Sequence, residues 1–166
     1  EDLLKYDITQ TVYTYQQAHI LSQEGQKLCK TAKIHIKIDT GMRRLGFEVD
    51  DISVEAIEKI CSLPNVLVEG IFTHFATADE RDKSFTRKQV EKFNYICNKL
   101  EEKGINIPIK HVSNSAAIID LPEYNFDMVR AGIMIYGLYP SQDVDKSKVD
   151  LKEVMSLKAR VSHVKD

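Results

Sequence analysis

The sequence predicts an α/β fold in which helices and parallel strands alternate. Short stretches of strand-like sequence alternate with apolar stripes of helical period, and no hairpin pattern appears until the last residues. Polar groups also recur where the strand patterns end, at Lys37, Asp39, His74, residues 113–115 and Arg130. Repeated βα units give a doubly wound sheet or a barrel, and polar groups at several strand ends favour the barrel. About five units are present, so we expect part of a (β/α)8 TIM barrel.

The elements follow one another in the order of βα units. Strands are predicted at residues 8–13, 34–39, 66–74, 107–112 and 128–136, and helices at residues 15–30, 53–63, 84–103 and 116–119. In the strand at 34–39, three isoleucines alternate with His35, Lys37 and Asp39, which indicates one face packed on helices and one face lining a polar interior. The helices at 53–63 and 84–103 each carry one apolar stripe, and Gly104 ends the second.

The composition changes near residue 140. Residues 1–140 are predicted to form the C-terminal portion of the barrel, and the polar, charged residues 141–153 a linker. Residues 154–166 alternate like the first strand of a β-rich second domain. The chain begins without methionine and ends in a strand pattern that has barely started, so we expect a piece of a longer protein.

Composition and charge exclude several classes of protein. The 166 residues include 43% hydrophobic and 29% charged residues, which is typical of a globular domain. The net charge of −2 does not indicate the excess of basic residues that nucleic-acid-binding proteins carry. The apolar runs are too short to cross a membrane, and the N-terminus does not resemble a signal peptide. The three cysteines lie in predicted helices without metal-ligand spacing, which favours a reducing, cytoplasmic compartment and no bound metal.

Lys37 is a candidate for chemistry, because a lysine inside a barrel must be paired, lose its proton or react. Three interpretations are open: an ion pair with Asp39, a Schiff-base lysine, or a lysine that has taken up carbon dioxide as a carbamate (N6-carboxylysine). Arg44 would give a carbamate a bidentate cationic partner, which favours the third. The adjacent Arg43 and Arg44 are not expected to share one direction, so one of them is expected to face solvent.

Three further strand ends carry candidate groups. His74 ends an apolar strand and is either structural or catalytic. Asn114 and Ser115 precede a short helix, where they form either an ordinary cap or an anion-binding turn. Arg130 is followed closely by Gly132, so a flat ligand has access to both the guanidinium and backbone N–H groups. Phosphate sites of barrel enzymes commonly lie after the last strands, which favours a binding role for this segment.

Four motifs occur in order along the chain: HIKIDTGMRRLG, EGIFTHFATADE, HVSNSAA and DMVRAGIMIYGLYPS. Together they resemble the alanine racemase family of fold-type III pyridoxal-phosphate enzymes, and the resemblance covers essentially the whole chain. It implies pyridoxal 5'-phosphate as the cofactor. It also implies that Lys37 carries the carbamate, and that Arg44 holds the phenolic oxygen of the cofactor and the carboxylate of the substrate.

The same resemblance implies the remaining cofactor contacts. Arg130 matches the arginine at the pyridine nitrogen, and His74 matches the histidine that supports it. Ser115, Gly132 and Ile133 match positions around the cofactor phosphate. The chain departs from the family at Arg43, where the family usually has glycine.

The implied activity is that of an isomerase that interconverts L- and D-alanine and supplies D-alanine for peptidoglycan, as a cytoplasmic homodimer. Racemisation in this family needs a base on each face of the substrate Cα. The Schiff-base lysine and the catalytic tyrosine that the family uses would both lie outside these residues. The isolated segment is therefore expected to be inactive.

Other functions compete with this interpretation. One is a racemase for serine or one of broad specificity, and another is a pyridoxal-phosphate carrier, although such carriers are usually the barrel alone. A third is a metal-dependent TIM-barrel hydrolase with a carbamylated lysine, which would recruit His35, Asp39, His74 and His111. Two arginines beside a divalent cation make the hydrolase electrostatically unfavourable.

Overall fold

The computed structural model describes residues 1–154 and 156–165. Its centre is a parallel sheet in the order β1-β2-β3-β4, formed by Gln10–Val12, Ala32–Lys37, Val66–Phe72 and Ile109–His111. The α-helices are α1 (Asp2–Lys5), α2 (Tyr15–Leu28), α3 (Asp51–Cys61), α4 (Ser84–Glu102) and α5 (Ser115–Asp120). Short 3-10 helices follow at Pro122–Tyr124, Ile133–Tyr136 and Lys146–Lys148.

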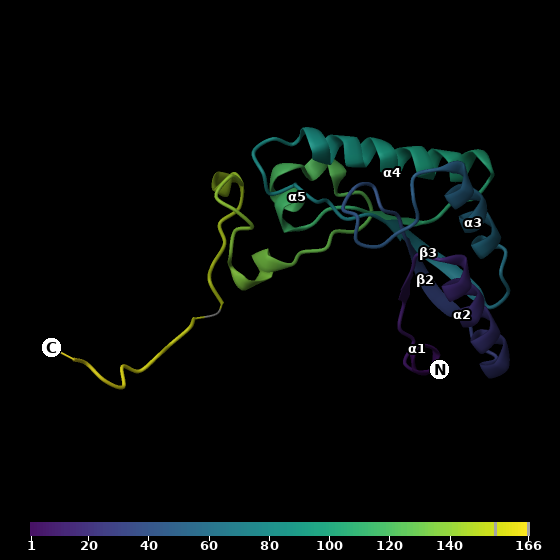
Figure 1. Ribbon diagram of the computed structural model, residues 1–166, viewed down its shortest axis with the longest axis horizontal. Coiled ribbons are helices and arrows are strands. Elements are labelled where there is room, and N and C mark those ends of the chain that lie inside the picture. The colour runs from purple at the N-terminus through teal and green to yellow at the C-terminus, as the bar shows by residue number, and fades with distance from the viewer. Residues whose placement is uncertain (155, 166) are drawn as a thin grey trace.

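The three long helices cover one face of the sheet (Figure 1). The strands are parallel and lie side by side in chain order, so right-handed crossovers place every connecting helix on the same side. This is the geometry of consecutive βα units in a barrel wall. It confirms the predicted α/β fold and the partial TIM barrel. No helix in the described part of the chain is long and apolar enough to cross a membrane.

The core lies between the sheet and these helices. The isoleucines of β2 and its end, Ile34, Ile36 and Ile38, are fully buried against the helices, as their alternation predicts. The apolar stripes of α3 and α4 supply the other side of this core: Val54, Ile57, Ile60, Val90, Phe93, Ile96, Cys97 and Leu100. The opposite face of β2 presents Lys33, His35 and Lys37 to the barrel interior.

Side-chain caps fix where the helices begin. The carboxylate of Asp50 accepts from the backbone N–H of Ser53 at the start of α3, and the amide oxygen of Asn114 accepts from Ala117 at the start of α5. Asn114 is thus the ordinary cap among the two predicted alternatives. Its cap places Ser115 at the first turn of α5, at the carboxyl edge of the sheet.

The strand predicted at residues 128–136 is wrong. Asp127 and Arg130 donate backbone N–H bonds to the carbonyls of Lys110 and Ser113, so the segment runs beside β4 without forming a ladder. The reason lies at the edge of β4, where the N–H of Lys110 bonds to the Asp127 carboxylate instead of a backbone carbonyl. The chain then turns at Gly132 into the 3-10 helix Ile133–Tyr136.

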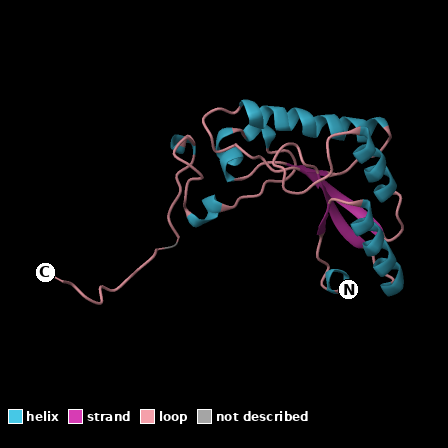
Figure 2. Cartoon of the chain, viewed as in Figure 1, coloured by secondary structure: helices cyan, strands magenta, loops and turns pink. Residues whose placement is uncertain are grey.

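Residues 141–149 pack against the barrel wall. Val144 is buried, and the carboxylate of Asp120 pairs with Lys83 at 2.9 Å and with Lys148 at 3.7 Å. Beyond this segment the chain extends away from the sheet (Figures 1 and 2). Residues 155 and 166 lie outside the described residues, and the others between 154 and 165 are exposed and in no strand. The strand at 154–166 and the β-rich domain stay a prediction.

Candidate active site

Most of the predicted site residues meet at the carboxyl edge of the sheet. Lys37 is the last residue of β2, His74 follows β3 by two residues, and Ser115 follows β4 by four. Parallel strands end at the same edge, so the chain brings these groups together although they lie far apart in sequence. The segment beside β4 adds Arg130 to the same edge.

Arg130 is the centre of this cluster. Its Nη1 donates to Nδ1 of His111 at 2.6 Å and to the His111 carbonyl at 3.3 Å. Its Nη2 shares two protons among three acceptors, the carbonyls of Thr73 at 2.8 Å and Val112 at 3.2 Å and Nδ1 of His74 at 3.2 Å. The guanidinium also lies over the ring of Phe72, 5.2 Å from its centroid. The side chain therefore ties the end of β3 to the end of β4.

The two histidines are held neutral. A guanidinium only donates, so each Nδ1 that it contacts must be an acceptor without a proton. Burial, and then the charge of Arg130, lower the pKa of His111 to about 3 and that of His74 to about 4. Burial also lowers the pKa of Arg130, to about 10, which leaves it charged at neutral pH. The cluster is thus a cation surrounded by neutral acceptors.

These pKa values predict that the folded protein loses stability in mild acid. The unfolded histidines bind protons near pH 6.5, whereas His74 and His111 do so only near pH 4 and 3. Between these values the unfolded state binds more protons than the folded state. The free energy of unfolding therefore decreases as the pH is lowered, by several kcal/mol at pH 4. Urea unfolding of the whole protein across this range measures the slope. His111→Asn should flatten it and exposed His19→Asn should not; equal slopes would contradict the assignment.

Lys37 is buried close to this cluster. Its Nζ donates to the carbonyl of Ile38 at 2.7 Å and lies 5.6 Å from the centroid of Phe72. Burial lowers the pKa of Lys37 to about 8; Asp39 opposes this shift, and Arg130 and Arg44 add to it. Oδ1 of Asp39 accepts instead from the backbone N–H groups of Gly41 and Arg43. Burial raises the pKa of Asp39, but these hydrogen bonds outweigh it and the net shift is downward.

The loop after β2 is closed at its base by backbone hydrogen bonds. Phe47 donates to the carbonyl of Lys37, and Asp39 donates to that of Phe47, both at 2.8 Å. Gly46 makes this closure possible, because its φ is +141° and an added Cβ would lie 2.4 Å from the backbone nitrogen of Asp39. The loop therefore holds Arg44 next to the end of β2.

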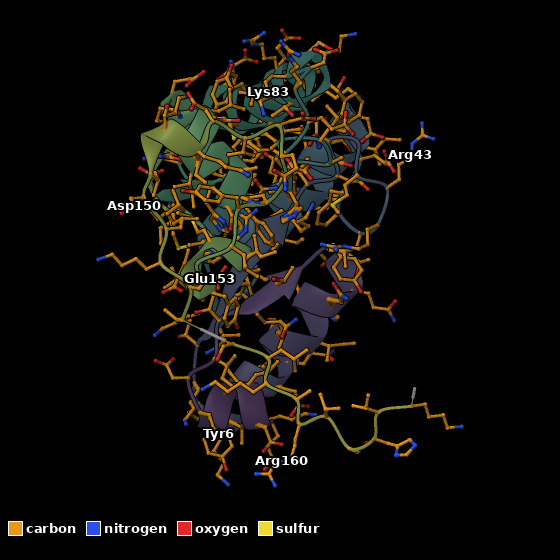
Figure 3. All side chains as sticks on the ribbon, turned by 90° about the vertical axis from the view of Figure 1, so that its left-hand side faces the viewer. Tyr6, Arg43, Lys83, Asp150, Glu153 and Arg160 are labelled. Carbon is orange, nitrogen blue, oxygen red and sulfur yellow. The ribbon has the colours of Figure 1, made fainter. Side chains whose placement is uncertain are left out.

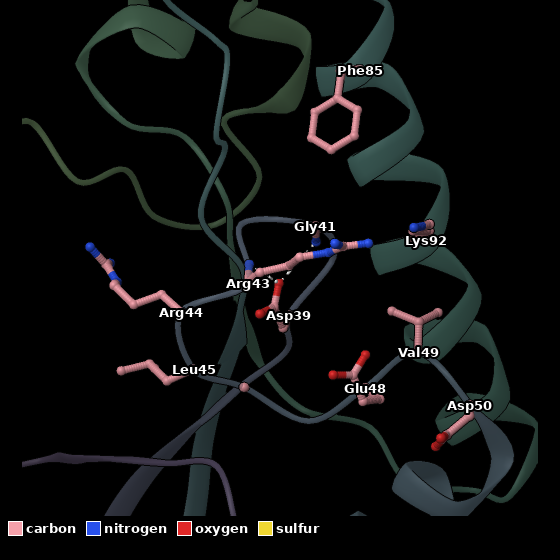
Figure 4. A pocket seen from close by; sticks show the side chains of 11 residues that line it. Asp39, Gly41, Arg43, Arg44, Leu45, Glu48, Val49, Asp50, Phe85 and Lys92 are labelled. Atoms are coloured by element: carbon pink, nitrogen blue, oxygen red, sulfur yellow. Dashed lines mark hydrogen bonds between the residues drawn. The ribbon is translucent and has the colours of Figure 1, made fainter.

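The two arginines of the loop point in opposite directions, as expected (Figure 4). Both side chains are exposed, and Arg43 projects from the edge of the molecule (Figure 3). The backbone of Arg43 is left-handed, with a φ of +56°. Glycine adopts this conformation without steric cost, whereas arginine pays a steric cost for it. The outward direction of Arg43 leaves room for its longer side chain.

Two cavities lie at this edge. One, of about 340 Å³, is lined by His74, Ser115, Arg130, Gly132 and Ile133 together with Met42 and neighbouring residues. The other, of about 1150 Å³, lies between the loop 39–50 and α4, where Arg43 and Arg44 reach it (Figure 4). The smaller cavity collects five of the seven predicted site residues. Lys37 lies buried nearby, and Arg44 lines the larger cavity.

Ser115 and the turn at Gly132 form one wall of the smaller cavity. The hydroxyl oxygen of Ser115 accepts from the backbone N–H of Gly132 at 2.8 Å and of Met134 at 3.4 Å. Because the hydroxyl oxygen accepts both N–H groups, the hydroxyl proton is left to donate to a ligand. A hydroxyl that is held in this way can donate to an oxygen of an anion such as phosphate.

Gln89 is a buried polar residue that was not among the site residues predicted from the sequence. Its Oε1 accepts from the N–H of Ala76 at 2.9 Å, and its Nε2 donates to the His74 carbonyl and to Oγ1 of Thr40, both at 3.1 Å. It therefore joins α4 to the loops after β2 and β3. A glutamine inside the apolar stripe of α4, next to Val90, is the signal that would have found it.

The positions of His35 and His111 do not agree with the hydrolase alternative, in which both would bind a metal. Instead of converging with Asp39 and His74, their rings meet each other, with Nδ1 of His35 2.8 Å from Nε2 of His111. Across the described residues, no three His, Cys, Asp or Glu side chains gather as metal ligands. The inward position of His111 on β4, beside the strand that leads to His74, is the pattern that would have marked it as a site residue.

A family model described as alanine racemase, N-terminal domain, matches residues 1–140. The chain belongs to the alanine racemase family. The alanine racemase of Clostridium tetani is 54% identical over 166 residues, which are all of this chain and 43% of that protein. The alanine racemase of Methanococcus maripaludis is 55% identical over 169 residues, all of this chain and 45% of its own length. The chain thus spans less than half the length of these alanine racemases.

Solved structures of the alanine racemase family have the same fold. The enzyme of Clostridium difficile 630 in complex with cycloserine superposes with a TM-score of 0.95 at 45% identity, covering 99% of this chain and 45% of that one. The alanine racemase of Bacillus anthracis with bound L-Ala-P gives 0.80 at 32% identity, covering 92% and 40%. These likenesses confirm the resemblance that the four motifs indicated.

Proposed function

We propose that the whole protein is a pyridoxal-phosphate-dependent alanine racemase, an isomerase that interconverts L- and D-alanine. The observation that carries the proposal is the environment of Arg130, a cation whose five hydrogen bonds all go to neutral acceptors. A largely buried cation without a counter-ion is costly unless a ligand uses its charge. Membership of the alanine racemase family and the names of the relatives support the same activity.

The residues present fit pyridoxal 5'-phosphate. The smaller cavity, of about 340 Å³, is within the range of small-molecule sites. Arg130 would face the ring nitrogen, with His74 supporting it, and Ser115, Gly132 and Ile133 would hold the phosphate. When bound, the cofactor withdraws electrons from the amino acid and makes its Cα proton acidic. A fixed cation at the ring nitrogen discourages protonation there, which weakens electron withdrawal and suppresses side reactions.

Arg44 and Lys37 complete the proposed site. Arg44 would bind the substrate carboxylate and the phenolic oxygen of the cofactor, since it is exposed and lines the cavity at the loop after β2. Lys37 as a carbamate would orient Arg44 through a bidentate ion pair. Alanine is the proposed substrate, and the active form is proposed to be a cytoplasmic homodimer that supplies D-alanine for peptidoglycan.

The proposal is tested with the whole protein and with this chain alone. The whole protein should show a visible cofactor absorption band that borohydride bleaches, and it should interconvert L- and D-alanine. The 166-residue chain should be inactive, because the two groups that move the Cα proton are expected outside it. A whole protein without the band or the activity would refute the proposal, and racemisation by the short chain would refute the placement of the bases.

Carbamylation of Lys37 can be tested separately from the racemase activity. The amine reacts with carbon dioxide only when neutral, and a pKa of about 8 leaves roughly a tenth of it neutral at pH 7. With ¹³C-bicarbonate at pH 8, the whole protein should give a carbamate resonance in ¹³C NMR. Lys37→Met should lack this resonance, and Lys33→Met, on the same face of β2, should keep it. A resonance that survives in Lys37→Met would place the modification elsewhere.

A further inference from the structure

His35 lies on the inward face of β2, two residues before Lys37, and has no part in the proposed catalytic or binding site. Its Nδ1 is 2.8 Å from Nε2 of His111, and the two ring centroids are 5.0 Å apart. Because Nδ1 of His111 contacts Arg130, the three side chains form a line across β2, β4 and the segment beside β4. His35 is the end of this line farthest from the cavity.

The sheet has a local irregularity that admits the His35 ring. Ile34 pairs with Val68 and His35 pairs with Gly70, so Glu69 is an extra residue in β3 and forms a bulge. A Cβ added to Gly70 would lie 2.6 Å from Cε1 and 2.7 Å from Nδ1 of His35. The ring therefore occupies space that only glycine leaves free.

The hydrogen-bond chemistry of the line allows one arrangement of protons. Arg130 only donates, so Nδ1 of His111 accepts and the proton of His111 must be on Nε2. Nε2 then donates to Nδ1 of His35, which places the proton of His35 on its own Nε2. The other neutral form of His111 would set an N–H against the guanidinium N–H. Arg130 excludes that form, and His35 stabilises the remaining one by accepting the hydrogen bond from Nε2 of His111.

We propose that His35 is a positioning residue: by accepting from Nε2–H it holds the His111 ring in the tautomer that faces Arg130, and thereby holds the orientation of Arg130. The bulge at Glu69 and the glycine at position 70 admit its ring. His35 does not line the cavity, so it acts on the site through His111. The consequence for racemisation rests on the proposed function. The tautomer of His111 and the geometry of the guanidinium do not depend on the proposed function, because they are properties of the protein without a ligand.

The direct test is ¹⁵N NMR of the histidine rings in the whole protein without cofactor. Nδ1 of His111 should resonate as an unprotonated nitrogen and Nε2 as an N–H, and Nδ1 of His35 should also be unprotonated. A proton on Nδ1 of His111, or a doubly protonated ring at neutral pH, would overturn the proposal whether or not the protein is a racemase. This measurement needs no variant, so it decides even if substitutions impair folding.

Variants separate positioning from a merely structural role. His35→Leu removes the acceptor and should give mixed His111 tautomers and averaged Nη resonances of Arg130. Asparagine carries an acceptor near the position of Nδ1, so His35→Asn should restore a single tautomer. Gly70→Ala, which pushes the ring away, should reproduce the leucine spectrum, and Lys33→Met should leave the spectrum unchanged. Equal spectra for His35→Leu and His35→Asn would overturn the proposal.

The functional consequence is measured by racemisation kinetics of the same proteins. His35→Leu should lower kcat by about tenfold, as is typical when a group that orients a binding residue is lost. His35→Asn should recover most of this loss. If the NMR spectra agree with the proposal but kcat is unchanged in His35→Leu, the orientation of Arg130 by His35 has no effect on racemisation. The inference about the reaction is then wrong. If no protein, including the wild type, racemises alanine, the proposed function fails instead.

Discussion

Replacing Arg130 with leucine is expected to abolish most of the activity and to destabilise the fold. The change removes the donor from three backbone carbonyls and two imidazole nitrogens at the ends of β3 and β4. Leaving such groups unpaired should lower the free energy of unfolding by about 3 kcal/mol. Loss of the fixed cation should reduce racemisation at least ~100-fold. Urea unfolding and D-alanine formation by the whole protein measure the two effects.

The same variant has a spectroscopic signature. Arg130 lowers the pKa of both His74 and His111, so these values should rise in Arg130→Leu. Arg130→Lys keeps the charge but lacks a planar fork, so it should keep the pKa values low while losing activity. Arg87→Leu, at an exposed position of α4, is the matched control and should change neither property. Unchanged histidine pKa values in Arg130→Leu would show that the charge of the guanidinium adds nothing to the effect of burial.

Replacing Gln89 with leucine should destabilise the protein, although Gln89 lines neither of the two cavities. The amide is fully buried and bonds to the backbone of Ala76 and His74 and to the hydroxyl of Thr40. Leucine fills the space but leaves the partly buried N–H of Ala76 and the partly buried carbonyl of His74 without partners. The expected loss is about 3 kcal/mol in the free energy of unfolding, measured with urea.

Gln89 also holds the loop that carries His74, so its loss should reach the site. Cofactor affinity of the whole protein should weaken in Gln89→Leu, because the His74 backbone is no longer fixed. Gln89→Glu keeps one acceptor but loses both N–H donors, and it should be destabilised as well. Lys88→Leu, the exposed neighbour on α4, should be close to wild type. A Gln89→Leu protein as stable as Lys88→Leu would contradict this account.

Much of the barrel wall could be predicted from local pattern. Alternation at Ile34, Ile36 and Ile38 predicted both the strand and its buried face, because side chains of a strand alternate between its two sides. The apolar stripes of α3 and α4 predicted their buried faces for the same kind of reason, with helical period. Burial of one face is a property that a short stretch of sequence carries by itself.

Other features depended on neighbours that local pattern does not contain. Residues 128–136 are apolar like a strand, but the carboxylate of Asp127 occupies a donor at the edge of β4, and no ladder forms. The partners of Arg130 were only partly predicted: His74 was expected, whereas His111 and the line to His35 were not. Both depend on the register between strands, including the bulge at Glu69.

The sequence by itself determined the alternating order of strands and helices, the polar inward face of β2, and the family, because each follows from short ordered motifs. Only the tertiary structure decided which of those polar groups meet and in what state of protonation. Parallel strands bring Lys37, His74 and Arg130 to one edge, but their contacts depend on a few ångströms of register and on the absence of a Cβ at Gly70. Hydrogen bonding and burial act over those distances, and they fix the neutral histidines around the charged arginine.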